Sequence, residues 1–319
     1  MKVAVIGAGA VGLGIGAGLA ANGVSVRFVI NRPAQRRALA TQGVSRSGLF
    51  GDLEVAPSDF SIADSIDALA DWPADHWLVC TKSTASRELV KQIAPVWRRM
   101  PTKPSVVLCQ NGWGNAEVFA TQIPPRHVFN ARVITGFVRN NETHIRVTAH
   151  ADSIHIGSLF GASTLELTGL TEAITRGGIP CEISQEIDKD LWAKMLYNGL
   201  LNPLGALVGV PYGVLAERDE TRAIMKALAH EIFDVMRAAD YSTHWQSADD
   251  YLTTFYQDLL PPTAEHQSSM LQDLQAGRMT EVEGLCGALC ELAAAHHVPA
   301  PLNDALLTLI RVAEARAST

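Results

Sequence analysis

The order of apolar and polar residues divides the chain into two parts of different character. In the first part, short apolar runs alternate with helical spacing, as in the run at residues 3–6 that precedes helical spacing over residues 10–21. Further apolar runs follow at residues 24–30, 77–81 and 106–110. Strands that are apolar throughout and separated by helices are typical of a parallel sheet covered on both faces. The sequence therefore predicts an α/β fold with a doubly covered parallel sheet.

The pattern changes twice further along the chain. Polar and apolar residues alternate over about residues 132–156, which favours an antiparallel edge of the sheet. After Ile183 the strand patterns stop, and helical spacing follows at residues 188–201, 221–239, 248–259, 268–275, 281–296 and 303–317. We therefore expect an N-terminal α/β domain over residues 1–183 and an all-helical domain over residues 184–319.

Composition and charge exclude several classes of protein. The chain has 319 residues, of which 47% are hydrophobic and 18% charged, so disorder and coiled coils are excluded. Its net charge of −7 makes a nucleic-acid partner unexpected. Five scattered cysteines favour free thiols and a cytoplasmic location. Glycines interrupt the apolar amino-terminal stretch, and no run of about 18 apolar residues occurs, so we expect neither a secretory signal nor a membrane span.

A glycine-rich segment follows the first predicted strand and opens a helix. It reads Gly7-Ala8-Gly9-Ala10-Val11-Gly12, which is the G-x-G-x-x-G fingerprint in the context that it requires. Gly7 permits a tight turn, Gly9 lets a pyrophosphate approach the backbone, and Gly12 allows close packing of helix and strand. The helix N-terminus supplies N–H groups to the phosphates. The segment predicts a dinucleotide site on a Rossmann-type sheet.

The end of the second predicted strand indicates which dinucleotide is bound. An Asp or Glu there holds the ribose hydroxyls of NAD, but this strand ends in Ile30-Asn31-Arg32. A guanidinium pairs with a 2′-phosphate instead, so Arg32 favours NADPH, with Arg36 or Arg37 as further candidates. No metal is expected, because the ten histidines show no ligand spacing.

Polar residues also follow the next two strands. Lys82 comes after the strand at residues 77–81, and Asn111 comes after the strand at residues 106–110. Ligands of open α/β sheets bind at the carboxyl ends of the strands, so both side chains are candidates for the cofactor crevice.

The helical part carries a stripe of polar residues. Lys194, Asn198 and Asn202 are spaced four residues apart and so share one face of a helix. Burying such polar groups in a core costs free energy unless they bind a ligand. The alternative interpretation is a stripe that faces solvent. Pro203 is expected to kink or end this helix. Thr280 and Glu283 have the spacing of a capping box at the start of a later helix.

Several of these segments, taken together, resemble the ketopantoate reductase (2-dehydropantoate 2-reductase) family over nearly the whole chain. The resemblance rests on Gly7 to Gly12, Thr81-Lys82, Gln110-Asn111-Gly112, Lys194-x3-Asn198-x3-Asn202-Pro203-Leu204, Ser268 to Asp273 and Arg278-x-Thr280-Glu281. It implies a Rossmann domain and a helical domain like that of 6-phosphogluconate dehydrogenase. It also implies the reduction of ketopantoate to pantoate with NADPH, in the pantothenate pathway.

The resemblance also implies roles for individual residues. Lys194 matches the general acid, and Asn111 matches a residue that touches both substrate and nicotinamide ribose. Lys82 and Glu281 match residues that position cofactor and substrate, and Glu281 is also a catalytic candidate. The matches to substrate-binding residues are Asn198, Asn202 and Ser269.

Three segments depart from the family pattern. Gly205 stands where Thr is frequent, Tyr212 replaces a substrate-side asparagine, and the stretch from Arg132 to Gly136 lacks the pattern expected near the nicotinamide. They leave open whether the substrate is ketopantoate or another 2-oxo acid.

The expected chemistry is a hydride transfer to a carbonyl carbon, with Lys194 protonating the oxygen. The alternatives are reduction of another 2-oxo acid or an imine on the same fold, and a non-catalytic NADPH sensor. A sensor would not need Lys194, Asn111 and Glu281 together. The sequence does not set the oligomeric state, and a homodimer stays open.

Overall fold

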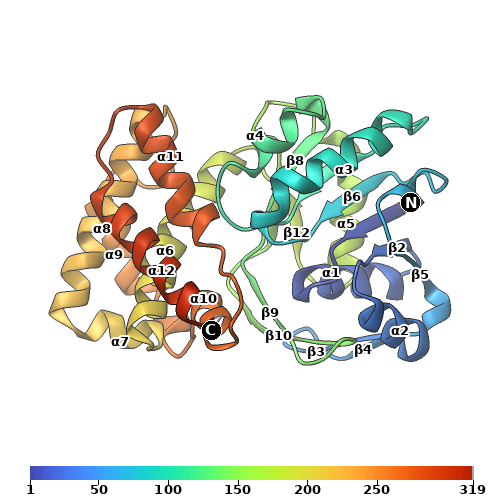
Figure 1. Ribbon diagram of the computed structural model, residues 1–319, viewed down its shortest axis with the longest axis horizontal. Coiled ribbons are helices and arrows are strands. Elements are labelled where there is room, and N and C mark those ends of the chain that lie inside the picture. The colour runs from blue at the N-terminus through green and yellow to red at the C-terminus, as the bar shows by residue number, and fades with distance from the viewer. Residues whose placement is uncertain (318–319) are drawn as a thin grey trace. The chain divides into compact units, whose positions relative to one another are not determined.

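The computed structural model of the protein describes residues 1–317 (Figure 1). The chain forms two compact units. One contains residues 1–110 and 115–187, and the other contains residues 111–114 and 188–319. Four residues after the strand at 105–108 therefore group with the second unit. Each unit is described by itself below.

The first unit is built on a large, mostly parallel sheet. Its strands are β1 (Lys2–Ile6), β2 (Ser25–Val29), β5 (Phe60–Ala63), β6 (His76–Val79), β7 (Ser105–Leu108), β8 (Val128–Arg132), β11 (Ile154–Gly157) and β12 (Cys181–Ile183). Their order is β12-β11-β8-β7-β6-β1-β2-β5, and β11 runs antiparallel to β8. The helices are α1 (Ala10–Ala21), α2 (Pro33–Gln42), α3 (Ser86–Arg99), α4 (Asn115–Ala120) and α5 (Thr168–Arg176). The predicted α/β class is confirmed.

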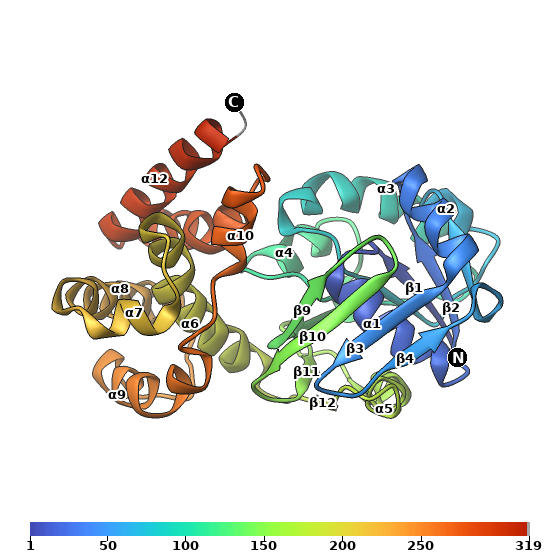
Figure 2. The same ribbon diagram turned by 90° about the horizontal axis from the view of Figure 1, so that it is seen from below.

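A second sheet forms a further layer of this unit. It consists of β3 (Val44–Gly48), β4 (Leu53–Val55), β9 (Thr135–Arg139) and β10 (His144–His150), in the order β4-β3-β10-β9. Figure 2 shows this sheet across α1. The alternating pattern over residues 132–156 does produce antiparallel pairs, but β9 and β10 belong to the second sheet and not to an edge of the first.

Helix α1 is buried between the two sheets, and this placement explains its glycines. Its residues 12–20 are all buried, so this stretch of the helix has no solvent-exposed polar face. A Cβ atom on Gly14 would lie 2.5 Å from the ring of Phe137 in β9. A Cβ atom on Gly16 would lie 2.4 Å from the ring of Phe28 in β2. The glycines therefore let α1 pack closely against a sheet on each side.

The second unit is helical in its described residues. Its helices are α6 (Ile187–Val208), α7 (Tyr212–Glu217), α8 (Asp219–Ala238), α9 (Ala248–Thr254), α10 (Ser269–Gln275), α11 (Ala288–Ala295) and α12 (Pro301–Ala317). Single π-helical turns, η6 (Phe255–Leu259) and η8 (Glu283–Gly287), continue α9 and precede α11.

The structure contradicts one local expectation for this unit and half of another. Helix α6 does not end at Pro203 but continues to Val208, because a proline removes only one helical hydrogen bond and the flanking leucines, Leu200, Leu201 and Leu204, are buried. Thr280 does cap the next turn, as its hydroxyl accepts from the Val282 N–H at 3.1 Å. Glu283 does not complete a capping box, since its carboxylate is held by the guanidinium of Arg311 at 2.7 and 2.8 Å.

No helix within residues 1–317 is long and apolar enough to cross a membrane. The five cysteines at positions 80, 109, 181, 286 and 290 are free thiols.

Candidate active site

The glycine-rich segment forms a tight turn between β1 and α1. Gly7 has a φ of +99°, and a Cβ atom there would lie 2.9 Å from the backbone nitrogen of Thr81. A Cβ atom on Gly12 would lie 2.1 Å from the Gly7 carbonyl oxygen. At Gly9, by contrast, the nearest atom to such a Cβ would be 3.9 Å away. Gly7 and Gly12 thus close the turn, while the space beside Gly9 and the N-terminus of α1 fits a pyrophosphate.

Arg32 lies next to this turn because a buried glutamine connects them. Arg32 precedes α2, and its guanidinium donates to the Gln35 side-chain oxygen. The Gln35 amide in turn donates to the Ala8 carbonyl oxygen at 2.8 Å, and Gln35 is only 1% exposed. Arg36 instead donates to the carbonyl oxygens of Ile30 and Asn31. Arg32 is therefore the arginine that the structure holds beside the dinucleotide turn.

The structure also brings an acidic residue to Arg32 that the sequence did not indicate. Glu142 lies between β9 and β10, and its carboxylate is 3.5 Å from the Arg32 guanidinium. Arg139, at the end of β9, is 3.5 Å from the other oxygen of the same carboxylate. Glu142 is 110 positions from Arg32, so no local pattern could have predicted the contact.

Lys82 and Gln110 lie at the carboxyl ends of adjacent strands, β6 and β7. The Gln110 amide donates to the Thr81 hydroxyl at 3.1 Å and to the Lys82 carbonyl oxygen at 3.2 Å. The Gln110 side-chain oxygen accepts from the Ser86 hydroxyl. The buried Gln110 side chain thus fixes the backbone of Lys82, whose own side chain is exposed.

Lys194, Asn111 and Glu281 form a continuous hydrogen-bonded chain in the second unit. The Lys194 ammonium donates to the Asn111 side-chain oxygen at 2.7 Å, and the Asn111 amide donates to the Glu281 carboxylate at 2.9 Å. Both ends of the Asn111 amide are therefore used, which fixes its orientation. An ammonium and a carboxylate are thus held on opposite ends of one amide.

The backbone on either side of this chain is tightly constrained. Gly112 has a φ of +88°, and a Cβ atom there would lie 2.2 Å from the Gly284 carbonyl oxygen. The Trp113 N–H donates to that same oxygen at 2.9 Å. The Thr280 N–H donates to the buried Glu314 carboxylate at 2.7 Å. Asn111 and Glu281 are therefore positioned by rigid neighbours, and only glycine fits at position 112.

A cavity brings together the other predicted residues of this unit. It is lined by Asn111, Gly112, Asn198, Asn202, Ser269, Met270, Glu281 and Leu285. Helix α6 supplies the two further asparagines, and the first residue of α10 supplies the serine. The wall thus combines amide and hydroxyl donors, one carboxylate and two apolar side chains, a set suited to a small polar molecule.

Two residues outside the predicted set of substrate ligands, Tyr212 and Ser268, adjoin its donors. The Tyr212 hydroxyl donates to the Asn202 side-chain oxygen at 2.6 Å, which leaves the Asn202 amide nitrogen as the donor end. Burial raises the pKa of Tyr212 far above its ordinary value, so its hydroxyl keeps its proton. The neighbouring Ser268 is the N-cap of α10 and accepts from the Leu271 N–H. Ser269 is therefore the serine that faces the cavity.

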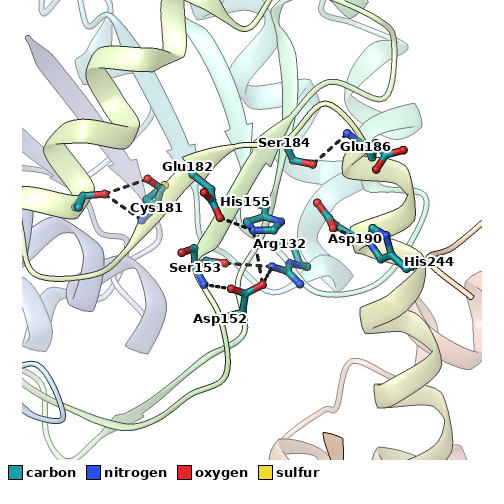
Figure 3. Close-up of polar contacts among 11 residues, drawn as sticks. Arg132, Asp152, Ser153, His155, Cys181, Glu182, Ser184, Glu186, Asp190 and His244 are labelled. Atoms are coloured by element: carbon teal, nitrogen blue, oxygen red, sulfur yellow. Dashed lines mark hydrogen bonds and ion pairs between the residues drawn. The ribbon is translucent and has the colours of Figure 1, made fainter. Parts of the chain in front are cut away.

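The unusual stretch from Arg132 to Gly136 has a structural use in the first unit (Figure 3). Arg132 is 8% exposed and donates to the Asp152 carboxylate at 2.7 Å. His155 is 2.9 Å from Glu182 and 3.7 Å from Asp152. Burial alone would raise the pKa of Asp152, but the hydrogen bonds from Arg132 and from the Ser153 N–H hold it below its ordinary value. Asp152, His155 and Glu182 could together face a cation, but Arg132 already neutralises Asp152, so we interpret them as an ion-pair network.

Comparisons with known proteins agree with these features. Residues 3–161 match the family model described as ketopantoate reductase PanE/ApbA, and residues 186–314 match that of its C-terminal part. A 2-dehydropantoate 2-reductase from Aquifex aeolicus (strain VF5) is 33% identical over 315 residues, which are 98% of this chain and 97% of the relative. The chain belongs to the ketopantoate reductase PanE/ApbA family. The resemblance seen in the sequence is confirmed, and membership makes the chain a nicotinamide-dependent oxidoreductase.

Solved structures agree on the fold. A PanE/ApbA family ketopantoate reductase from Ralstonia eutropha JMP134 has a TM-score of 0.86 and 27% identity, with all of both chains covered. D-mandelate dehydrogenase, solved with NADH and anilino(oxo)acetate, has a TM-score of 0.87 and 18% identity, also with both chains fully covered. At that identity the second similarity concerns the fold alone.

Proposed function

We propose that this protein reduces 2-dehydropantoate (ketopantoate) to pantoate with NADPH, as a step of pantothenate biosynthesis. The name of its relatives, 2-dehydropantoate 2-reductase, supports the substrate. The observation that carries the proposal is the chain from Lys194 through Asn111 to Glu281, two members of which line a cavity of amide and hydroxyl donors. In this proposal, residues 1–183 form the NADP-binding domain and residues 184–319 the substrate domain.

Lys194 is the proton donor in this proposal. When bound, NADPH supplies a hydride to the carbonyl carbon of the substrate. The carbonyl oxygen gains negative charge as this happens, and a nearby ammonium stabilises that charge and then transfers its proton. The Asn111 carbonyl oxygen holds the Lys194 ammonium in one orientation without adding a negative charge beside it. In this proposal, the Lys194 ammonium donates to the ketone oxygen from the position that Asn111 gives it.

The polar groups of the substrate pair with different parts of the cavity. The substrate carboxylate accepts hydrogen bonds from Ser269 and from the Asn198 and Asn202 amides, which are neutral donors. The Glu281 carboxylate repels that group but accepts a hydrogen bond from a hydroxyl. Ketopantoate carries a carboxylate, a ketone and a distal hydroxyl, so the cavity together with Lys194 offers a partner for each.

In this proposal, Arg32 is the residue that selects NADPH over NADH. Its guanidinium lies beside the turn at Gly7 to Gly12 through Gln35, and the end of β2 supplies no carboxylate of its own. A guanidinium pairs with a phosphate through parallel hydrogen bonds. Lys82, at the end of β6, is a second basic residue for the cofactor.

A second candidate substrate is another 2-oxo acid. Tyr212 favours it, because an aromatic ring stands where the family pattern has an asparagine and its hydroxyl is engaged with Asn202. We also propose a cytoplasmic location, which the five free thiols support.

Activity measurements on the purified protein test the proposal. NADPH oxidation is followed with ketopantoate, pyruvate, 2-oxoisovalerate and phenylglyoxylate as separate substrates. We expect the largest kcat/KM with ketopantoate and a much smaller rate when NADH replaces NADPH. A larger kcat/KM for one of the other acids would favour the second candidate, and no turnover with any of them would contradict both.

A further inference from the structure

We propose that Glu142 sets the cofactor preference of this protein by competing with the 2′-phosphate of NADPH for Arg32 and Arg139. The inference rests on the proposed use of NADPH and names two residues that the family comparison does not assign. It makes Arg139 a second phosphate ligand and Glu142 an internal competitor of the phosphate.

One carboxylate is shared by two guanidinium groups at this position. Glu142 lies 3.5 Å from Arg32 through one oxygen and 3.5 Å from Arg139 through the other. The side chains of Arg32, Glu142 and Arg139 are 46%, 39% and 31% exposed. Ion pairs of this length and exposure are weak and are readily exchanged for a better anion. A phosphate is such an anion, because it carries more charge and more acceptor oxygens.

The backbone of Glu142 is fixed by hydrogen bonds on both sides of the turn. The Gln35 amide, which also bonds the Ala8 carbonyl oxygen, donates to the Glu142 carbonyl oxygen at 3.3 Å. The Asn141 side chain accepts from the Thr143 and His144 N–H groups, each at 2.8 Å, which closes the turn around Glu142. The connection between β9 and β10 is thereby tied to the dinucleotide turn. Glu142 is thus held where the ribose of the adenosine is expected.

The same carboxylate acts in opposite directions on the two cofactors. With NADPH, the 2′-phosphate takes the guanidinium groups, and the displaced Glu142 then stands beside a phosphate of like charge. With NADH, the free 2′-hydroxyl donates to the Glu142 carboxylate, as it does to the acidic residue at the end of β2 in NAD-binding folds. Glu142 therefore lowers the preference for NADPH that Arg32 and Arg139 create.

Binding of two nucleotide fragments tests this role without any need for catalysis. Dissociation constants of 2′,5′-ADP and 5′-AMP are measured by calorimetry for the wild type, E142Q, E142A and R139M. The matched control is E172Q, which removes a carboxylate from an exposed pair with Arg176 on α5. Thermal unfolding of each variant shows that it is folded.

We expect E142Q and E142A to bind 2′,5′-ADP roughly threefold to tenfold more tightly than the wild type, the range given by one or two exposed ion pairs. R139M should bind it more weakly by a similar factor. R139M should bind 5′-AMP within about twofold of the wild type, whereas E142A, which removes the acceptor of the 2′-hydroxyl, should bind it more weakly. E172Q should match the wild type for both fragments. Unchanged or weaker binding of 2′,5′-ADP by folded E142Q or E142A would overturn the inference.

The outcome separates this inference from the choice of NADPH itself. If the wild type binds both fragments equally and R32A changes neither, the choice of NADPH is wrong. A gain of 2′,5′-ADP affinity in E142Q would then still support Glu142 as a residue that excludes phosphate. If the wild type prefers 2′,5′-ADP but E142Q leaves that preference unchanged, NADPH is right and the role of Glu142 is wrong.

Discussion

Two amide side chains hold the charged residues of the candidate sites. Asn111 accepts from Lys194 and donates to Glu281, and Gln35 accepts from Arg32 and donates to the Ala8 carbonyl oxygen. An amide offers an acceptor and a donor at fixed positions, so it orients a cation without neutralising it. At the scale of the residue, amide side chains thus fix the positions of the Lys194 ammonium and the Arg32 guanidinium.

The role of Lys194 predicts a selective loss of turnover. Lys194→Ala should lower kcat by about 10²- to 10⁴-fold, the usual range for general acid–base catalysis. NADPH affinity, measured by fluorescence titration, should stay nearly unchanged. Wild-type turnover should also fall at alkaline pH as the ammonium loses its proton. The control is Lys226→Ala, which removes an exposed ammonium that pairs with Asp249 on the surface. Retention of most of the kcat by Lys194→Ala would mean that another group donates the proton.

The role of Arg32 predicts a cofactor-specific effect. Arg32→Ala should weaken NADPH binding by roughly tenfold to a hundredfold, because a hydrogen bond to a charged group contributes about 1.5–3 kcal/mol. NADH lacks the phosphate, so its affinity should change little. Dissociation constants for both cofactors measure the effect. Equal weakening of the two would show that Arg32 supports the fold of the turn and does not bind the phosphate.

At the scale of the element, local sequence patterns predict the architecture. Contacts between residues that are distant in sequence cannot be predicted from such patterns. The alternation of apolar runs and helical spacing depends on neighbouring residues, and it correctly predicts the α/β class. The glycine spacing from Gly7 to Gly12 is equally local, and it correctly predicts a turn between a strand and a helix. Glu142 reaches Arg32 only because two strands form a hairpin beside α2, which no periodicity reveals. Tyr212 joins Asn202 through the turn between α6 and α7. The helix does not end at Pro203, because burial of the neighbouring leucines outweighs the loss of one hydrogen bond.

The packing of α1 gives a prediction at this scale. Gly16→Ala should lower the free energy of unfolding by about 1–2 kcal/mol, because overpacking costs about 1–3 kcal/mol and exceeds the helix propensity gained. Phe28, whose ring the new methyl group would strike, is fully buried. The control is Gly205→Ala in α6, where the nearest atom would be 3.6 Å away, and which should be neutral or stabilising. Denaturant unfolding measures both, and equal stabilities would contradict the packing described for α1.

At the scale of the whole molecule, the ion pair between Arg132 and Asp152 makes stability depend on pH. The pKa of Asp152 lies below its ordinary value in the folded protein, so folding favours the ionised carboxylate. Its contribution is complete above the unfolded pKa of about 3.9 and is lost as the pH falls through the lower folded value. The Asp152 side chain is 51% exposed, so solvent screening keeps this contribution small.

We therefore expect Asp152→Asn to be less stable than the wild type at neutral pH by about 1 kcal/mol or less. The difference should shrink as the pH falls below about 4, where the wild-type carboxyl group also becomes neutral. Thermal unfolding across this pH range measures it. Asp67→Asn, which affects a carboxylate that is 82% exposed, is the control. A difference that grew toward acidic pH would contradict the assignment.

The central claim, that the cavity is built for ketopantoate, is tested most directly by one pair of substrates. Ketopantoate and 2-oxo-3,3-dimethylbutanoate differ only in the distal hydroxyl. A site with polar groups for that hydroxyl rejects the analogue, because Glu281 then lacks the hydrogen bond that the hydroxyl would donate. With NADPH as the cofactor, kcat/KM for ketopantoate should exceed that for the analogue by at least about tenfold. Comparable values for the two acids would contradict the claim and identify the protein as a reductase of another 2-oxo acid.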